Sequence, residues 1–224
     1  MPDRAVIFDL DGTLVDTAPD LMRATNHVLD RLGRRPITTE EVRAFVGHGA
    51  RALLTRGLAA TGGLPENYDV EPDYRLFVDY YSRNIAAGSA PFPGLTRLLT
   101  RLKAEGFGLG VCTNKLEGLS VQLLDALDLS KYFGAVVGPD TIGVAKPDPR
   151  PFREAVARLG LVAPRAVMVG DSETDILTAR NAGVPVIAVP FGYTPRPVEE
   201  FGPDRMIAHF DEAYDAIQDL FALA

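Results

Sequence analysis

The chain has 224 residues, of which 46% are hydrophobic and 24% are charged, as in an ordinary globular protein long enough for one full domain and a smaller one. Its net charge of −7 gives no basic surface for nucleic acid or for an anionic membrane, so neither partner is expected. The single cysteine, Cys112, excludes an internal disulfide and a thiolate zinc site, and without a membrane span or a signal peptide we expect a cytoplasmic protein.

Short apolar runs bounded by turn residues predict buried β-strands. These runs lie at residues 5–10, 109–113, 135–138, 166–170 and 184–189. Between them, leucines at helical spacing predict helices over residues 95–102 and 119–127. Strands that alternate with helices favour parallel pairing through right-handed crossovers. The predicted fold class is therefore α/β, with a three-layer, Rossmann-like parallel sheet that has helices on both faces.

Residues 16–87 interrupt this alternation and are predicted to be helical throughout. Thr17 and Asp20 have the spacing of a capping box, a pattern that begins helices. A second helix is expected after Thr39, and a third from about Ala50. An all-helical insertion thus follows the first strand directly.

A fourth helix of this insertion has a hydrophobic stripe at helical spacing. The stripe consists of Tyr74, Phe77, Val78 and Tyr81. We interpret it as the core of a helical bundle rather than as a ligand-binding surface. Two domains are expected: a core domain of residues 1–15 and 88–224, and a helical cap domain of residues 16–87. We also expect the cap to move as a lid over the sheet, with hinges near residues 14–16 and 88–94.

Acidic residues follow the predicted strands at their carboxyl ends, where parallel sheets bind ligands. Asp9 and Asp11 follow the first strand, and their i, i+2 spacing directs both carboxylates to one side. Asp171 ends the fourth strand, and Asp175 lies in the first turn of the helix after it. Each alone could cap a helix or order a turn, but together they would repel one another unless a cation offset their charge. Oxygen ligands without cysteine or histidine favour Mg²⁺.

Groups suited to binding an anion are predicted at the same edge of the sheet. Thr113 and Asn114 end the second strand, and Lys146 lies in the loop after the third. Beside Mg²⁺, they would suit a phosphoryl group, whose transfer depends mainly on positioning and charge stabilisation. One carboxylate could attack phosphorus to form an aspartyl phosphate, which water then hydrolyses. A neighbouring aspartate could protonate the leaving alkoxide and later deprotonate the water.

These segments resemble the four motifs of the haloacid dehalogenase superfamily. The first motif is similar to residues 9–13, Asp-Leu-Asp-Gly-Thr, the second to Thr113-Asn114, the third to Lys146-Pro147, and the fourth to Gly170-Asp171-Ser172 with Asp175. The predicted helical insertion lies where the superfamily has its C1 cap. Because the four motifs occur in order over nearly the whole chain, the resemblance is specific.

The resemblance implies roles for the acidic residues. Asp9 would be the nucleophile, and Asp11 would be the general acid and base. Mg²⁺ would be bound by Asp9, Asp171 and Asp11, the last through its backbone carbonyl. Asp175 would lie behind these ligands or bind the metal through water.

The resemblance also implies that Thr113, Asn114 and Lys146 hold the phosphate.

Among the activities of the superfamily, the second aspartate of the first motif argues against a dehalogenase, and the absence of lysine from the predicted cap argues against a phosphonatase. Phosphomutases of the superfamily have a histidine where this chain has Leu21, so a mutase is a less favoured alternative. We therefore expect a phosphomonoesterase that acts on a small-molecule phosphate ester.

Three segments resemble superfamily phosphatases that act on 2-phosphoglycolate, namely residues 16–21, 45–50 and 191–193. In the second segment, Gly47 and Gly49 expose backbone N–H groups at a helix start, which is a ready anion site, and Arg51 lies just inside that helix. With His48, these residues are candidates for substrate specificity, although a turn between helices that requires glycine explains the pattern equally well. Phosphatases for sugar phosphates and for pyrophosphate are similar in the same places, so these substrates stay open.

Two non-hydrolytic alternatives predict different sequences. A phosphate- or metal-sensing site would be expected to have lost Asp9 or Asp11, and both are present. In a phospho-acceptor signalling domain the phosphorylated aspartate ends the third strand, but residues 135–138 contain no aspartate. We therefore expect an enzyme, either a monomer or a homodimer.

Overall fold

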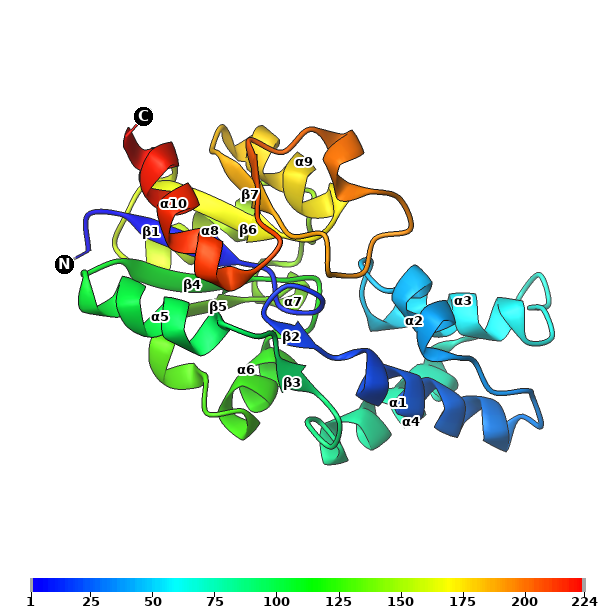
Figure 1. The fold of residues 1–224 in the computed structure, drawn as a ribbon. Helices are drawn as coiled ribbons and strands as arrows, with labels where there is room; N and C mark the ends of the chain where they lie inside the picture. The colour runs from blue at the N-terminus through cyan, green and yellow to red at the C-terminus, as the bar shows by residue number, and fades with distance from the viewer. Residues whose placement is uncertain (1, 223–224) are drawn as a thin grey trace.

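The structure is a computed structural model, and it describes residues 2–222. A six-stranded sheet forms the centre of the larger part of the molecule (Figure 1). In sheet order, the strands are β5 (Ala135–Val137), β4 (Gly108–Cys112), β1 (Ala5–Phe8), β6 (Ala166–Gly170), β7 (Val186–Ala188) and β8 (Arg205–Met206). All neighbouring strands pair in parallel. The predicted strands are confirmed, and β8 was missed because its two exposed residues form no apolar run.

Helices cover both faces of this sheet (Figure 1). They are α5 (Leu95–Ala104), α6 (Glu117–Ala126), α7 (Pro139–Ile142), α8 (Arg150–Arg158), α9 (Glu173–Ala182) and α10 (Ala213–Ala222), with short 3₁₀ helices at Ser130–Tyr132, Ala163–Arg165, Val198–Phe201 and Phe210–Glu212. In β1, Ala5 and Ile7 belong to the core beneath α8 and α9, whereas Val6 and Phe8 belong to the core beneath α5, α6 and α10. This burial on both faces explains the continuous apolar runs of the strands, and the predicted three-layer α/β fold is confirmed.

Four helices lie between two short strands that follow β1. The helices are α1 (Ala18–Arg31), α2 (Thr39–Phe45), α3 (Ala50–Ala60) and α4 (Glu71–Arg83), and the strands are β2 (Val15–Asp16) and β3 (Ala90–Pro91). Figure 1 shows this helical group beyond the carboxyl ends of the central strands. Strands β2 and β3 pair antiparallel, so the chain enters and leaves the helical group through one narrow ribbon. Within residues 2–222, no helix combines the length and hydropathy that a membrane crossing requires.

The start of α1 differs from the predicted capping box. The hydroxyl of Thr17 makes no capping hydrogen bond. Asp20 is 1% exposed and instead accepts hydrogen bonds from the backbone N–H groups of Gly88 and Ser89, at 2.9 and 2.8 Å, and from the Ser89 hydroxyl at 2.7 Å. The prediction was wrong because the carboxylate finds three donors on the returning chain. Asp20 therefore ties the start of α1, where the chain enters the helical group, to the segment before β3, where the chain leaves it.

A capping box does begin α2, at a position that the sequence prediction did not name. The Thr38 hydroxyl accepts a hydrogen bond from the backbone N–H of Glu41, and the Glu41 carboxylate accepts one from the backbone N–H of Thr38. These bonds satisfy backbone donors that have no partner within the helix. They fix the start of the helix that was predicted after Thr39.

Candidate active site

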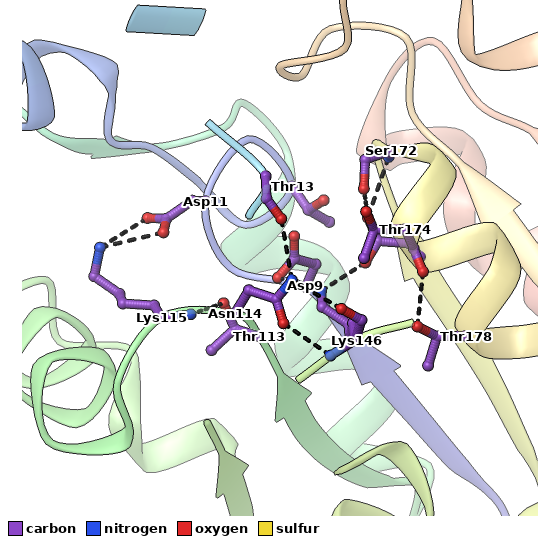
Figure 2. Close-up of polar contacts among 12 residues, drawn as sticks. Asp9, Asp11, Thr13, Thr113, Asn114, Lys115, Lys146, Ser172, Thr174 and Thr178 are labelled. Carbon is purple, nitrogen blue, oxygen red and sulfur yellow. Dashed lines mark hydrogen bonds and ion pairs between the residues drawn. The ribbon is translucent and has the colours of Figure 1, made fainter. Parts of the chain in front are cut away.

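Polar residues from distant parts of the chain meet because β1 lies between β4 and β6 in the sheet. The residues at this edge are Asp9 and Asp11 after β1, Thr113 and Asn114 after β4, Lys146 between α7 and α8, Asp171 after β6, and Asp175 in the first turn of α9. Figure 2 shows Lys146 beside Asp9, and Asp11 directed toward a different lysine, Lys115. The structure thus brings the predicted core-domain residues to one edge of the sheet.

Three carboxylates form a compact group at this edge. One oxygen from each of Asp9, Asp171 and Asp175 lies within 4.8 Å of the other two. Their residues are 8%, 2% and 0% exposed. The side chain of Asp11 is not in this group, because it forms an ion pair with Lys115. Asp175, which was expected to lie behind the metal ligands or to bind the metal through water, is part of this group.

Two of the three carboxylates, those of Asp171 and Asp175, are held by hydrogen bonds from their surroundings. Asp171 accepts one from the Thr13 hydroxyl, at 2.8 Å, and one from the backbone N–H of Tyr193, at 2.6 Å. Asp175 accepts from the Ser172 hydroxyl at 2.7 Å and from the Lys146 ammonium at 2.6 Å. These bonds fix the direction of both carboxylates before any ligand binds.

Glycines leave room for Asp171. Gly12 has a positive φ of 87°, and a Cβ there would lie 2.6 Å from Oδ2 of Asp171. A Cβ at Gly192 would lie 2.2 Å from Cβ of Asp171, closer than any real contact. Side chains at these two positions would therefore displace the carboxylate.

The charges of this group fit a divalent cation. Lys146 Nζ lies 2.8 Å from Asp9 Oδ1 and 2.6 Å from Asp175 Oδ1, but one ammonium against three carboxylates leaves an excess of two negative charges. Burial raises the pKa of Asp9 to about 6, although Lys146 opposes this effect. Burial, together with repulsion from Asp175 and Asp9, also raises the pKa of Asp171. Asp9 Oδ1 is shielded from solvent and is paired with the Lys146 ammonium, so the two uncompensated charges of the group are what a divalent cation would offset.

The predicted phosphate-binding residues lie beside this group. The Thr113 hydroxyl is buried and accepts a hydrogen bond from the backbone N–H of Lys115 at 3.2 Å. The Asn114 side chain accepts from the backbone N–H of Lys146 at 2.9 Å and donates to the backbone carbonyl of Gly47 at 3.1 Å. Asn114 therefore ties the segment that carries Lys146 to the loop between α2 and α3.

A cavity of about 210 Å³ opens above these residues, between the sheet and the helical group. Asp9, Asp11 and Thr113 line it from the sheet. The predicted cap residues Gly47, His48, Gly49 and Arg51 all line it from the loop between α2 and α3 and from the start of α3. The structure thus brings the predicted cap residues to one cavity with Asp9, Asp11, Thr113 and Asn114, whereas Lys146, Asp171 and Asp175 do not line it.

The aromatic stripe of α4 also borders this cavity. Phe77 and Tyr81 are buried in the core, as predicted, but both line the cavity together with Tyr74. Arg51 forms an ion pair with Glu71 at 2.5 Å and lies 4.2 Å from the centre of the Tyr74 ring. The interpretation of the stripe as core alone was therefore incomplete, because one helix face serves both purposes.

The haloacid dehalogenase-like hydrolase family matches residues 6–189, a span that includes all four strand-end motifs. The chain belongs to this family. It is 51% identical over 205 residues to a phosphoglycolate phosphatase of Caulobacter vibrioides, an alignment that covers 92% of this chain and 86% of that protein. It is 45% identical to a phosphoglycolate phosphatase of Mesorhizobium japonicum, with 92% and 91% covered.

A solved structure agrees with these relationships. The crystal structure of a predicted phosphoglycolate phosphatase from Haemophilus somnus superimposes on this hydrolase with a TM-score of 0.89 and 30% sequence identity, covering 96% of this chain and 98% of the other. The shared fold therefore extends over the helical group as well as the sheet.

Sequence reasoning missed one charged residue of this hydrolase's cavity, Lys115. Its Nζ lies 3.1 and 3.2 Å from the two carboxylate oxygens of Asp11, and 4.4 Å from the centre of the Tyr81 ring. Burial by itself lowers the pKa of Lys115, but Asp11 and Tyr81 together raise it above the usual value, so the ammonium stays charged. A lysine after a strand is usually solvated, and only its position directly after Thr113-Asn114 could have signalled a role.

Proposed function

We propose that this haloacid dehalogenase-like hydrolase is a Mg²⁺-dependent phosphomonoesterase and that its substrate is 2-phosphoglycolate. The observation that carries the proposal is the buried group of Asp9, Asp171 and Asp175 around Lys146, from which Asp9 lines a cavity of about 210 Å³ between the sheet and the helical group. The names of relatives at 43–51% identity support the choice of substrate.

Asp9 would act as the nucleophile. Its carboxylate oxygen attacks phosphorus, the bond from phosphorus to the ester oxygen breaks, and Asp11 gives a proton to the leaving alkoxide. Asp11 then takes a proton from water, whose oxygen attacks the phosphorus of the aspartyl phosphate and releases inorganic phosphate. Asp9 is thereby restored as a free carboxylate, and the ester is converted to glycolate.

The neighbouring residues would hold the metal and the phosphoryl group. Asp9, Asp171 and the backbone carbonyl of Asp11 would bind Mg²⁺, and Asp175 would hold Lys146 and remain close to the metal. When bound, Mg²⁺ would offset the excess negative charge and polarise the phosphoryl oxygens. The Thr113 hydroxyl and the Lys146 ammonium would contact the phosphoryl oxygens, while Asn114 orders the segment that carries Lys146.

The four helices between β2 and β3 would form a cap domain of residues 16–87 over a core domain of residues 1–15 and 88–224. Closure of this cap would exclude water during attack by Asp9 and reopen for product release. The hydrogen bond from Asn114 to Gly47 supports this proposal, because it joins the two sides of the cavity at the place where a lid would meet the sheet.

The experiment that tests the function compares kcat/KM in Mg²⁺ for 2-phosphoglycolate, glucose 6-phosphate, pyrophosphate and a nucleoside monophosphate. We expect 2-phosphoglycolate to exceed the others by at least about tenfold. A higher value for the sugar phosphate or for pyrophosphate would assign the alternative substrate instead. Asp9→Asn should abolish all these activities, whereas Asp79→Asn, an exposed change on α4, should leave them intact.

A further inference from the structure

One arginine and one lysine line the cavity, and they differ in environment. The Arg51 side chain is 51% exposed and already forms an ion pair with Glu71. The Lys115 side chain is 5% exposed, and its ion-pair partner, Asp11, itself lines the cavity. Lys146 does not line this cavity, and it is the ammonium proposed to hold the phosphoryl group beside Asp9 and Asp175, so it is not a candidate for a second anionic group. Lys115 is therefore the buried cation that an anionic ligand in this cavity would meet.

The contact between Lys115 and Asp11 shows that this ammonium can bind a carboxylate. Both oxygens of Asp11 lie within 3.2 Å of Nζ. An ammonium has three N–H donors, so two contacts with one carboxylate leave capacity for another. Asp11 is the residue proposed to protonate the leaving oxygen, which places Lys115 close to the part of the substrate that follows that oxygen.

Tyr81 supplies a second polar group at the same place. Its ring lies 4.4 Å from Lys115 Nζ and is stacked at 5.9 Å on Phe77, which fixes its orientation. Its hydroxyl is buried beside the Lys115 ammonium, and it makes no hydrogen bond of ordinary geometry within residues 2–222. A buried hydroxyl whose O–H proton lacks an acceptor is costly, and a ligand oxygen that accepts this proton would remove that cost.

We propose that Lys115 and Tyr81 recognise the carboxylate of the substrate, Lys115 from the segment after β4 and Tyr81 from α4. The inference rests on the proposed function, because it names the residues that would distinguish a two-carbon phosphate with a carboxylate from a neutral phosphate ester. The two residues lie side by side but belong to different parts of the fold, so a bound carboxylate would contact both the helical group and the segment after β4.

The test measures kcat/KM for 2-phosphoglycolate and for 2-hydroxyethyl phosphate, in which a neutral CH₂OH group replaces the carboxylate. The quantity compared is the ratio of the two values, since a general effect on Asp11 changes both substrates equally. Lys115→Met should lower this ratio on the order of 100-fold, because a buried charged partner is lost. Lys115→Arg should retain part of the ratio, and Lys103→Met, an exposed lysine of α5, should retain all of it.

Tyr81→Phe keeps the ring and removes only the hydroxyl, so it provides a second test if Lys115→Met fails to fold. We expect it to lower the ratio about tenfold. An unchanged ratio in a folded Lys115→Met protein overturns the inference, as does an unchanged ratio in Tyr81→Phe when only that variant folds. If the unmodified enzyme itself has no preference for 2-phosphoglycolate, the proposed function fails first.

Discussion

Tyr193 holds Asp171 through its backbone, with its N–H 2.6 Å from the carboxylate, while its side chain reaches the connection to the helical group. The Tyr193 hydroxyl accepts a hydrogen bond from the backbone N–H of Ala18, at 2.9 Å, and donates one to Asp16. One residue thus contacts both the carboxylate group and the ribbon through which the chain enters α1.

Tyr193→Phe should weaken this connection without removing the bond to Asp171, which is made by the backbone. We expect the free energy of unfolding to fall by about 1–2 kcal/mol, because the N–H of Ala18 loses its closer acceptor and keeps only Asp16 Oδ1, at 3.4 Å. Urea denaturation measures this change. Since Asp171 stays in place, the midpoint of a Mg²⁺ titration followed by activity should move less than threefold. A large loss of Mg²⁺ affinity without loss of stability would contradict this assignment, in which the Tyr193 backbone holds Asp171 and its hydroxyl only stabilises the connection to α1.

Gly192→Ala should displace Asp171, because the added methyl group would lie 2.2 Å from its Cβ. Groups that orient metal ligands typically change metal affinity by about 10- to 100-fold when altered, and we expect a loss in that range. Mg²⁺ titration of activity measures it. Gly118→Ala in α6 is the matched control, since a Cβ there meets nothing within 4 Å. Equal Mg²⁺ affinity in the two variants would show that Asp171 does not need the space that Gly192 leaves beside it.

Asp20→Ala should destabilise the protein, because three hydrogen-bond donors of Gly88 and Ser89 would lose their buried acceptor. We expect a loss of about 2–4 kcal/mol in the free energy of unfolding, measured in urea. Asp79→Ala removes an exposed aspartate that pairs with Arg83, and it should have little effect. If both variants were equally stable, Asp20 would not tie the start of α1 to the segment before β3 in solution.

Asp171→Asn should affect stability in opposite directions with and without Mg²⁺. Without metal, it removes one of three repelling carboxylates, and the Thr13 hydroxyl can accept a hydrogen bond from the new amide, so the Tm should rise. Adding Mg²⁺ should raise the Tm of the unaltered protein, because a ligand that binds only the folded state stabilises it. The variant should lack most of this increase. Differential scanning calorimetry in EDTA and in Mg²⁺ measures both effects, and a full Mg²⁺ shift in the variant would exclude Asp171 as a ligand.

The strand-end residues could be predicted because each strand of a parallel sheet is specified by a short stretch of neighbouring residues. A short apolar run such as residues 5–8 specifies a buried strand, and the residue that follows it must lie at the carboxyl edge. The motif residues of the core were therefore found without any knowledge of strand order. The fold class followed from the alternation of such runs with helices.

Other contacts depend on side chains that carry no local signal. Lys115 has the sequence context of a solvated lysine, but it is buried where it meets Tyr81 of α4 and Asp11. Asp20 has the spacing of a capping box, but its carboxylate binds residues nearly seventy positions away. In both cases, a competing partner from a distant segment overrides the local preference.

The sequence by itself determined which residues could carry the chemistry: its apolar runs place strands, and the residues after them lie at one edge. Only the tertiary structure decided which charges meet, pairing Lys146 with Asp9 and Asp175, and Lys115 with Asp11. The physical reason is that strand formation depends on neighbours in sequence, whereas the energy of a buried charge depends on whichever partner folding brings within a few ångströms.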